Sequence, residues 1–218
     1  METKEAEPVV PTWNFAARPW EGPATGAGTG ATGKRGDDGD NGTSHWDSGQ
    51  TKNICDKQPT DGKDGKPGET PDPPERAADG RPGGVVTQNI GVCKGPITIW
   101  YGAGDGQKGG KGGTGGTGGA GGTKGECPGG CNTAKDGKQG PGGKGGNGGQ
   151  GGNGGVTGLI TVFYTDAGAT FTVTQVGCGA GNGGDPGDPG QGDGNLGGGS
   201  TGTGGAASIP PKINFNKQ

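Results

Sequence analysis

Five cysteines carry most of the reactive chemistry in this sequence: Cys55, Cys93, Cys127, Cys131 and Cys178. Their odd number leaves at least one thiol free or bonded to another chain. A chain with little apolar core gains stability from disulfides in an oxidising compartment. Cys127 and Cys131 lack the spacing of a redox motif, and zinc would need about four ligands where only these two are close in sequence. We therefore predict disulfides, as one staple or as separate bridges, and no metal site.

Groups suited to catalysis are sparse. The chain has one histidine, His45, so a Ser-His-Asp triad would depend on it entirely. Each Gly-Lys pair lacks the Ser or Thr that must follow it in a phosphate-binding loop. We predict that the protein is not an enzyme and that it has no catalytic residue and no cofactor.

The stretch GKRGDDGDNG at 33–42 contains two further patterns. Its carboxylates at Asp37, Asp38 and Asp40 could attract calcium, but the other ligands of a calcium loop are missing. The Arg-Gly-Asp tripeptide that begins at Arg35 would suggest integrin binding, but this tripeptide occurs often by chance in charged glycine triplets. We interpret the stretch as a solvated charge run.

The composition excludes a conventional globular core. Of 218 residues, 62 are glycine and 23% are hydrophobic, whereas ordinary domains contain about 7% glycine. The net charge is −3, and Lys and Asp residues are interspersed along the chain, so no basic face for nucleic acid is evident. No apolar run approaches the roughly 20 residues that span a bilayer, and residues 1–15 do not show a classical secretion signal. We predict neither nucleic-acid binding nor a membrane span.

The most regular feature is a glycine repeat with a period of three. GGKGGTGGTGGAGG at 109–122 and GPGGKGGNGGQGGNGG at 140–155 keep two glycines in nearly every triplet. This period matches the polyproline-II conformation, in which a tract of about 19 residues is near 60 Å long. Bare glycine edges let backbones approach, so N–H and C=O groups can pair between tracts. Linkers usually combine glycine with serine, which is scarce here, so we predict ordered helices packed side by side.

Two segments have the β-branched and aromatic residues of strands. We predict a short antiparallel hairpin at 85–101 and another at 159–176. No segment has the apolar period of a helix, so essentially no α-helix is expected. Aromatic side chains that are not buried would mark an interface. These candidates are Trp13, Phe15, Trp20, Trp100, Tyr101, Phe163, Tyr164 and Phe171.

These features divide the chain into four parts. They are an extended docking arm at 1–33, a collagen-like and proline-rich segment at 34–84, the hairpins and glycine helices at 85–205, and a C-terminal tail at 206–218. The predicted fold class is a non-α bundle of polyglycine-II or polyproline-II-type helices with short antiparallel β-hairpins.

The tracts at 109–122 and 140–155 resemble the polyglycine-II bundles of springtail antifreeze proteins. They are also similar to the glycine-rich tips of bacteriophage tail-fibre adhesins and to glycine-rich surface proteins of bacteria. The resemblance implies a glycine-helix bundle. For an antifreeze protein it implies an ice-binding edge of small side chains, here Thr114, Thr117, Ala120 and Thr123. Lysines at positions 108 and 111 begin the same row, whereas a flat and weakly charged face is expected of an ice binder.

We predict a non-enzymatic structural or adhesive protein, a subunit of an extracellular fibre, surface layer or virion appendage, assembled through backbone-hydrogen-bonded glycine helices. It would associate with itself or with neighbouring structural subunits, at the cell surface or on a virion. One alternative is an ice-binding protein that uses the Thr/Ala edge. Another is a receptor-binding adhesin tip that uses the loops between tracts.

Overall fold

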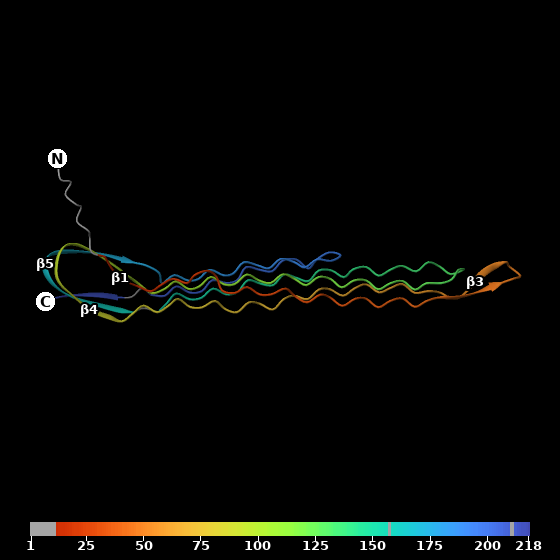
Figure 1. Ribbon diagram of the computed structural model, residues 1–218, viewed down its shortest axis with the longest axis horizontal. Coiled ribbons are helices and arrows are strands. Elements are labelled where there is room, and N and C mark those ends of the chain that lie inside the picture. Colours follow the sequence, from red (N-terminus) through yellow and green to blue (C-terminus); the bar gives the residue numbers. More distant parts are fainter. Residues whose placement is uncertain (1–11, 157, 210–211) are drawn as a thin grey trace, which may run out of the picture.

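The computed structural model describes residues 12–156, 158–209 and 212–218 as a rod with a β-sheet at one end (Figure 1). Residues 1–11 of the predicted arm and 210–211 of the predicted tail lie outside the described residues. The described part contains no helix, as predicted. Its strands are β1 (Thr12–Ala16), β2 (Thr43–Asp47), β3 (Lys52–Lys57), β4 (Val86–Gly102), β5 (Leu159–Gln175) and β6 (Lys212–Lys217).

Six extended segments of the described chain run side by side along the rod (Figure 1). The first layer runs away from the four-stranded sheet and contains segments 23–42, 103–126 and 178–192. The second layer runs back toward the sheet and contains segments 60–83, 135–156 and 195–208. Segments are parallel within each layer, and the two layers are antiparallel to each other.

Backbone hydrogen bonds join these segments at every third residue over most of their length. Within the first layer, the N–H of Gly30 donates to the carbonyl oxygen of Thr114 at 2.8 Å. Between the layers, the N–H of Gly119 donates to the carbonyl oxygen of Lys66, also at 2.8 Å. A buried backbone group that lacks a partner is costly, so each segment depends on its neighbours for its pairing.

The two central segments have the most hydrogen-bonded neighbours and also the highest glycine content. The central segments 103–126 and 135–156 each bond to four neighbours and carry two glycines in most triplets. Segments 23–42 and 60–83 bond to two and three neighbours and carry one glycine in most triplets. Contact requires a bare backbone: a Cβ at Gly119 would collide with the carbonyl group of Lys34. Tracts with two glycines per triplet are therefore inside, and the collagen-like triplets are outside.

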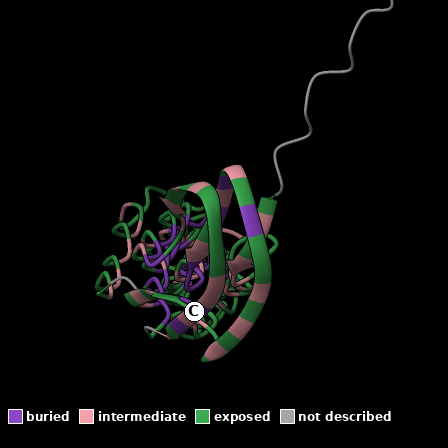
Figure 2. Ribbon diagram, turned by 90° about the vertical axis from the view of Figure 1, so that its left-hand side faces the viewer, coloured by how far each residue is buried: buried purple, intermediate pink, exposed green. Residues whose placement is uncertain are grey.

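The two antiparallel hairpins predicted at 85–101 and 159–176 are wrong. Each segment is one continuous strand, and the two strands pair with each other in parallel, from Val86 opposite Ile160 to Tyr101 opposite Gln175. Both strands curve back on themselves, as the broad ribbons in Figure 2 show. β4 thereby connects segment 60–83 to segment 103–126, and β5 connects segment 135–156 to segment 178–192.

Glycines allow this curvature. Gly91, Gly95 and Gly168 have positive φ angles of 68°, 71° and 92°, a region that other residues rarely adopt. They lie near the middle of β4 and β5, where the register between the strands also shifts. The glycines that would form the turns of the predicted hairpins thus form bends within single strands.

The predicted arm and tail both join this sheet. The strand order is β1-β4-β5-β6, and every neighbouring pair is parallel. β1 pairs with the end of β4 over 98–102, and β6 pairs with the start of β5 over 159–164. The described parts of the arm and tail therefore dock on the chain's own sheet.

The sheet covers the apolar core of the described chain. Side chains alternate between the faces of a strand, so Ile97 and Ile99 point inward and are 4% and 1% exposed, whereas Trp100 is 43% exposed. Ile160 and Val162 of β5 complete this layer with Cys93. The apolar residues thus gather at one end of the rod, where the backbone must reverse direction.

Replacing Gly119 by Ala should destabilise the rod. Gly-to-Ala changes at unstrained positions usually stabilise a protein by about 0.4–1 kcal/mol. Here the added methyl group would overpack a backbone contact, which typically costs about 1–3 kcal/mol. The matched control is Thr117→Ala, an exposed side chain, which should change stability by no more than about 0.5 kcal/mol. Chemical denaturation followed by circular dichroism would measure both, and a stabilised Gly119→Ala variant would contradict the close packing.

Candidate functional site

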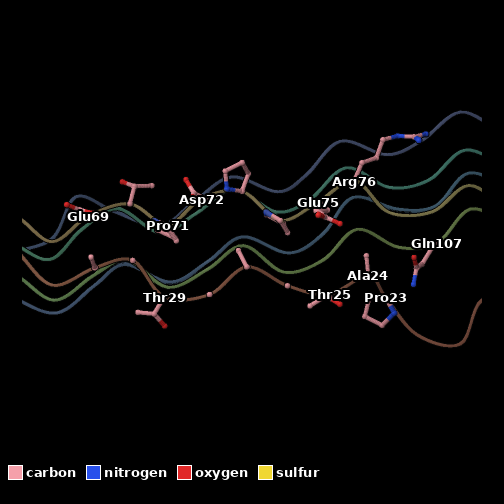
Figure 3. Close-up of a pocket in the computed structure, with 18 of the residues that line it drawn as sticks. Pro23, Ala24, Thr25, Thr29, Glu69, Pro71, Asp72, Glu75, Arg76 and Gln107 are labelled. Carbon is pink, nitrogen blue, oxygen red and sulfur yellow. The ribbon is translucent and has the colours of Figure 1, made fainter.

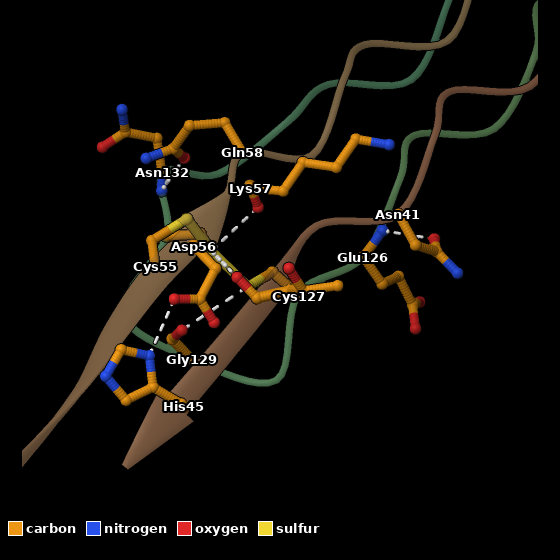
Figure 4. Close-up of a disulfide and its surroundings, with 12 residues drawn as sticks. Asn41, His45, Cys55, Asp56, Lys57, Gln58, Glu126, Cys127, Gly129 and Asn132 are labelled. Carbon is orange, nitrogen blue, oxygen red and sulfur yellow. Dashed lines mark hydrogen bonds and ion pairs between the residues drawn. A yellow bond between two sulfur atoms is a disulfide. The ribbon is translucent and has the colours of Figure 1, made fainter. Parts of the chain in front are cut away.

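A hairpin and a turn close the far end of the rod. β2 and β3 form an antiparallel pair that connects segments 23–42 and 60–83, and the turn 127–131 connects the two central segments. Gly130 has a φ of 71°, and a Cβ there would collide with the backbone carbonyl of Asn53. The turn can therefore pack directly against β3 (Figure 4).

This packing brings three sulfur atoms together. The Sγ atom of Cys131 is in bonding contact with those of both Cys55 and Cys127, and all three lie within 4.8 Å of one another. One sulfur forms one disulfide at a time, so the Cys55–Cys131 and Cys127–Cys131 bridges are alternatives. Whichever bridge forms, the third cysteine is left as a thiol beside it.

Backbone carbonyl groups surround the sulfur atoms. Sγ of Cys131 lies 3.6 Å from the carbonyl oxygen of Thr43 and 3.5 Å from that of Lys57, and Sγ of Cys127 lies 3.5 Å from that of Gly129. All three cysteines are half-buried. The cluster is therefore held by the chain on several sides while a small reagent can still reach it.

The remaining two cysteines lie at the other end of the rod. Cys93 and Cys178 are both buried and both free. Burial raises the pKa of the Cys93 thiol, and Asp166 raises it further. Thiolate is the reactive form of cysteine, so Cys93 is less reactive than an ordinary thiol. Of the five candidate disulfide cysteines, the structure groups three.

Sequence distance concealed this cluster. Cys127 and Cys131 are the two ends of one turn, four residues apart, but Cys55 is 76 residues away from Cys131. A signal does exist: segments 23–42 and 60–83 enclose Cys55, just as the two central segments enclose the turn. Matching the lengths of the tracts would have placed both connections at the same end of the rod.

The carboxylates of the 33–42 stretch do not converge. Asp37 binds Lys63 at 2.9 Å, whereas Asp38 binds Arg35 at 2.6 Å. Within the described residues, the cysteine cluster is the group of three or more potential metal ligands that lie close together. The carboxylates of the 33–42 stretch are not part of it. The Arg-Gly-Asp tripeptide is extended along the rod, with both of its charged side chains in ion pairs. His45 Nδ1–H donates to Asp56 Oδ1 at 2.7 Å.

The row of small side chains proposed for ice binding lies on the outside of the central segment 103–126. Thr117, Ala120 and Thr123 are exposed and Thr114 is half-buried. The ion pairs Lys108–Asp185 and Lys111–Asp188, at 2.8 and 3.0 Å, occupy the beginning of the row. The Arg35–Asp38 pair lies beside its far part, where Asp38 accepts the N–H of Thr123. These small side chains therefore form a single row next to charged groups.

Most of the aromatic interface candidates pack at the sheet end of the rod. Five of them contact the buried core while remaining partly exposed: Trp13, Phe15, Tyr101, Tyr164 and Phe171. Trp20 donates its indole N–H to the carbonyl oxygen of Asp79 at 3.0 Å and stacks under the Arg81 guanidinium. Phe163 is half-buried and Trp100 is exposed on the outer face. The exposed Trp46, on β2 at the far tip, was not among the candidates.

A groove of about 1000 Å³ separates segments 23–31 and 69–76 (Figure 3). Pro71 and Pro74 occupy positions where glycine donates elsewhere in the same segment, and proline has no N–H. Backbone bonds between the two outer segments stop at the pair from Glu69 N–H to the Ala31 carbonyl. The prolines thus remove donors to the central segment 135–156 and place ring atoms against Gly113, Gly146 and Gly149, beside the groove.

Ion pairs and backbone donors lower the pKa values of several exposed carboxyl groups. The Arg35 guanidinium, followed by the N–H of Thr123, lowers the pKa of Asp38 to about 2. The N–H of Ala169, followed by the Lys217 ammonium, lowers the pKa of Asp166 to about 2. Both carboxylates join elements that are distant in sequence, so their charged forms favour the folded rod.

No family model and no curated protein matches the chain. Among solved structures, it matches a nine-helix polyproline type II bundle, a springtail antifreeze protein from Granisotoma rainieri, with 24% identity over 72% of this chain and 98% of that chain. The TM-score is 0.12, so the match carries no argument about fold or function. The described residues include no helix that could cross a membrane.

We expect the two alternative bridges to stabilise the protein unequally. In the loop-closure picture, a bridge across 76 residues contributes about 4–5 kcal/mol and one across four residues about 2 kcal/mol. Oxidised Cys55→Ser, which retains the short bridge, should therefore unfold more easily than oxidised Cys127→Ser, by about 2–3 kcal/mol. Denaturation under non-reducing conditions would measure this gap, which should vanish on reduction. Peptide mapping that found Cys131 unpaired in the oxidised protein would contradict the assignment.

Stability should fall as the solution becomes acidic. Asp38 and Asp166 have folded pKa values near 2, below the ordinary value of about 3.9 that an unfolded Asp has. A depressed folded pKa contributes stability above the unfolded value, and that contribution is lost as pH falls from about 4 toward 2. Melting temperatures at pH 5, 3 and 2 should decrease in that order.

Asp38→Asn isolates one part of this effect. The amide oxygen can still accept the N–H of Thr123, but the side chain no longer titrates, so the pH dependence should be shallower. Asp193→Asn, in the connection between segments 178–192 and 195–208, is the matched control and should keep the wild-type slope. Equal slopes in all three proteins would show that Asp38 does not contribute.

Proposed function

We propose that the six extended segments are polyglycine-II or polyproline-II-type helices and that they make the protein a rigid rod. The observation that supports this most directly is the three-residue period of the backbone hydrogen bonds, which equals one turn of such a helix. The alternation of buried glycines with exposed residues, such as Gly118 and Gly119 with Thr117 and Ala120, has the same period. One residue of each triplet in the central segments is then free to vary without disturbing the packing.

From this architecture we infer a non-enzymatic structural or adhesive role. The protein would be a subunit of an extracellular fibre, a surface layer or a virion appendage. A rod held by backbone bonds gains length without a larger apolar core, which suits a spacer or a scaffold. Its two ends differ in chemistry: the sheet end carries half-exposed aromatic rings, and the far tip carries the cysteines and Trp46.

Neighbouring structural subunits are the proposed partners. Among the described residues, β6 covers β5 only over 159–164, so the edge of β5 from 165 to 175 has a strand on one side only. An unpaired edge presents N–H and C=O groups to another chain. Val173 at this edge is 39% exposed although its side chain points toward the core. The sheet end therefore offers both backbone and apolar contacts for assembly.

Ice binding is a second candidate. The exposed row of small side chains on segment 103–126 favours it, and the ion pairs beside that row disfavour it. Thermal hysteresis of the purified protein decides this point directly: strong hysteresis in a monodisperse monomer would replace the structural proposal.

A receptor-binding adhesin tip is a third candidate. Trp46 favours it because its side chain is 61% exposed at the far end of the rod, in a connection between two segments. Binding of the isolated protein to cells or glycans, abolished by Trp46→Ala and retained by Trp100→Ala at the opposite end, would support this role.

Amide hydrogen exchange tests the rod itself. We expect the glycine amides of 104–125 and 137–155 that donate to neighbouring segments, such as Gly116, Gly119 and Gly146, to exchange slowly, whereas free glycine-rich chains exchange at once. Gly192 and Gly194 in the connection at 192–195 supply an internal control, because they are exposed and are not among the described backbone donors, so they should exchange fast. Small-angle scattering should give the profile of a stiff rod. Unprotected glycine amides together with a flexible-chain profile would overturn the proposed function.

A further inference from the structure

We propose that the reduced thiolates of Cys55, Cys127 and Cys131 form a zinc-binding site at the far tip. The three sulfur atoms converge within 4.8 Å of one another, although they come from a strand and from both ends of a turn. A disulfide uses two of them and leaves the third without a partner. A metal ion uses all three, so it accounts for the whole cluster.

The spacing suits zinc. Tetrahedral Zn²⁺ holds thiolate sulfur at about 2.3 Å, which places pairs of ligand sulfurs about 3.8 Å apart. The sulfur atoms of this cluster lie within 4.8 Å of one another, so small side-chain rotations would place them around an ion. Soft thiolate ligands favour Zn²⁺ and Cu⁺ over Mg²⁺ and Ca²⁺.

The site would leave one zinc position open. Within the described residues, the ligand group consists of the three cysteines, and no histidine, aspartate or glutamate provides a fourth ligand. His45 and Asp56, the nearest such side chains on β2 and β3, bind each other at 2.7 Å. A water molecule would complete the tetrahedron, as it does in zinc sites with three protein ligands.

The rest of the tip holds the ligands in place. Cys55 is fixed by the β2–β3 pairing, in which it lies opposite Ser44. The turn that carries Cys127 and Cys131 is fixed by the contact of Gly130 with Asn53. The metal would thus staple the outer segments 23–42 and 60–83 to the two central segments, the same connection that the Cys55–Cys131 bridge makes.

The metal and the disulfide exclude each other. A small-molecule disulfide can oxidise two of the thiolates: the protein gains one S–S bond and the reagent leaves as two thiolates. Only one protein thiolate then remains, so the ion is released. The redox state of the surroundings would therefore decide which staple the tip contains.

The test uses the full chain, reduced with a phosphine and freed of metal. Titration with Zn²⁺ alone should end at one ion per chain, and Co²⁺ as a probe should give thiolate-to-cobalt charge-transfer absorption. Zinc should slow the reaction of the tip thiols with a thiol reagent by roughly tenfold or more. Each of the variants Cys55→Ser, Cys127→Ser and Cys131→Ser should weaken zinc binding by roughly 100-fold or more.

Asn132→Ala is the matched control, since it changes a neighbouring exposed side chain and leaves all three thiols in place. It should bind zinc as the wild type does. Circular dichroism and amide exchange of segment 103–126 would show that each serine variant keeps the rod. Reduced protein with three accessible tip thiols and no zinc uptake would overturn the site, and so would a Cys55→Ser variant that binds as tightly as the wild type.

Discussion

The whole rod depends on one constraint: an extended backbone with no internal hydrogen bonds must find its partners on neighbouring segments. Each central segment meets that need with four neighbours, and such crowding is compatible only with glycine at the contact positions. Ordering so much glycine is costly in conformational entropy, because glycine loses more freedom than any other residue. The cost is offset by hydrogen bonds that are short, regular and shielded by neighbouring segments.

The β-sheet at the end of the rod provides hydrogen-bond partners where the chain reverses direction, which the glycine segments do not. A chain that runs out and back must reverse direction, and a reversal leaves backbone groups without a lateral partner unless the turns themselves stack. β4 and β5 make these reversals as parallel strands, about 4.8 Å apart like strands in any sheet. Segments 103–126 and 178–192 continue from these strands, so the sheet sets their spacing. The few large apolar residues of the chain fill the space that the curved strands enclose.

Local sequence signals predicted part of this architecture. The absence of helix and the strand character of both β segments followed from residue type and period. The hairpin prediction failed because a central glycine in an apolar run marks either a turn or a bend in one strand, and the partner decides which. For Val86 that partner is Ile160, at a sequence distance that no local pattern can span. Cys55 was missed as a neighbour of Cys131 for the same reason, since the contact depends on equal lengths of two outgoing segments.

The distribution of glycine also indicates where partners can approach. The outer segments 23–42, 60–83 and 178–192 carry about one glycine in most triplets, so side chains cover much of their outer edges. The fourth outer segment, 195–208, is richer in glycine, and a Cβ at Gly198 or Gly204 would meet one atom within 4 Å. Pro186 and Pro189 on segment 178–192 also lack a backbone N–H, so they cannot donate a hydrogen bond to another chain. Lateral growth of the glycine layers is therefore hindered along segments 23–42, 60–83 and 178–192, unlike at the sheet edge formed by residues 165–175. Interactions with other molecules should then concentrate at the two ends, where aromatic rings, an open strand edge and thiols replace paired glycine backbone.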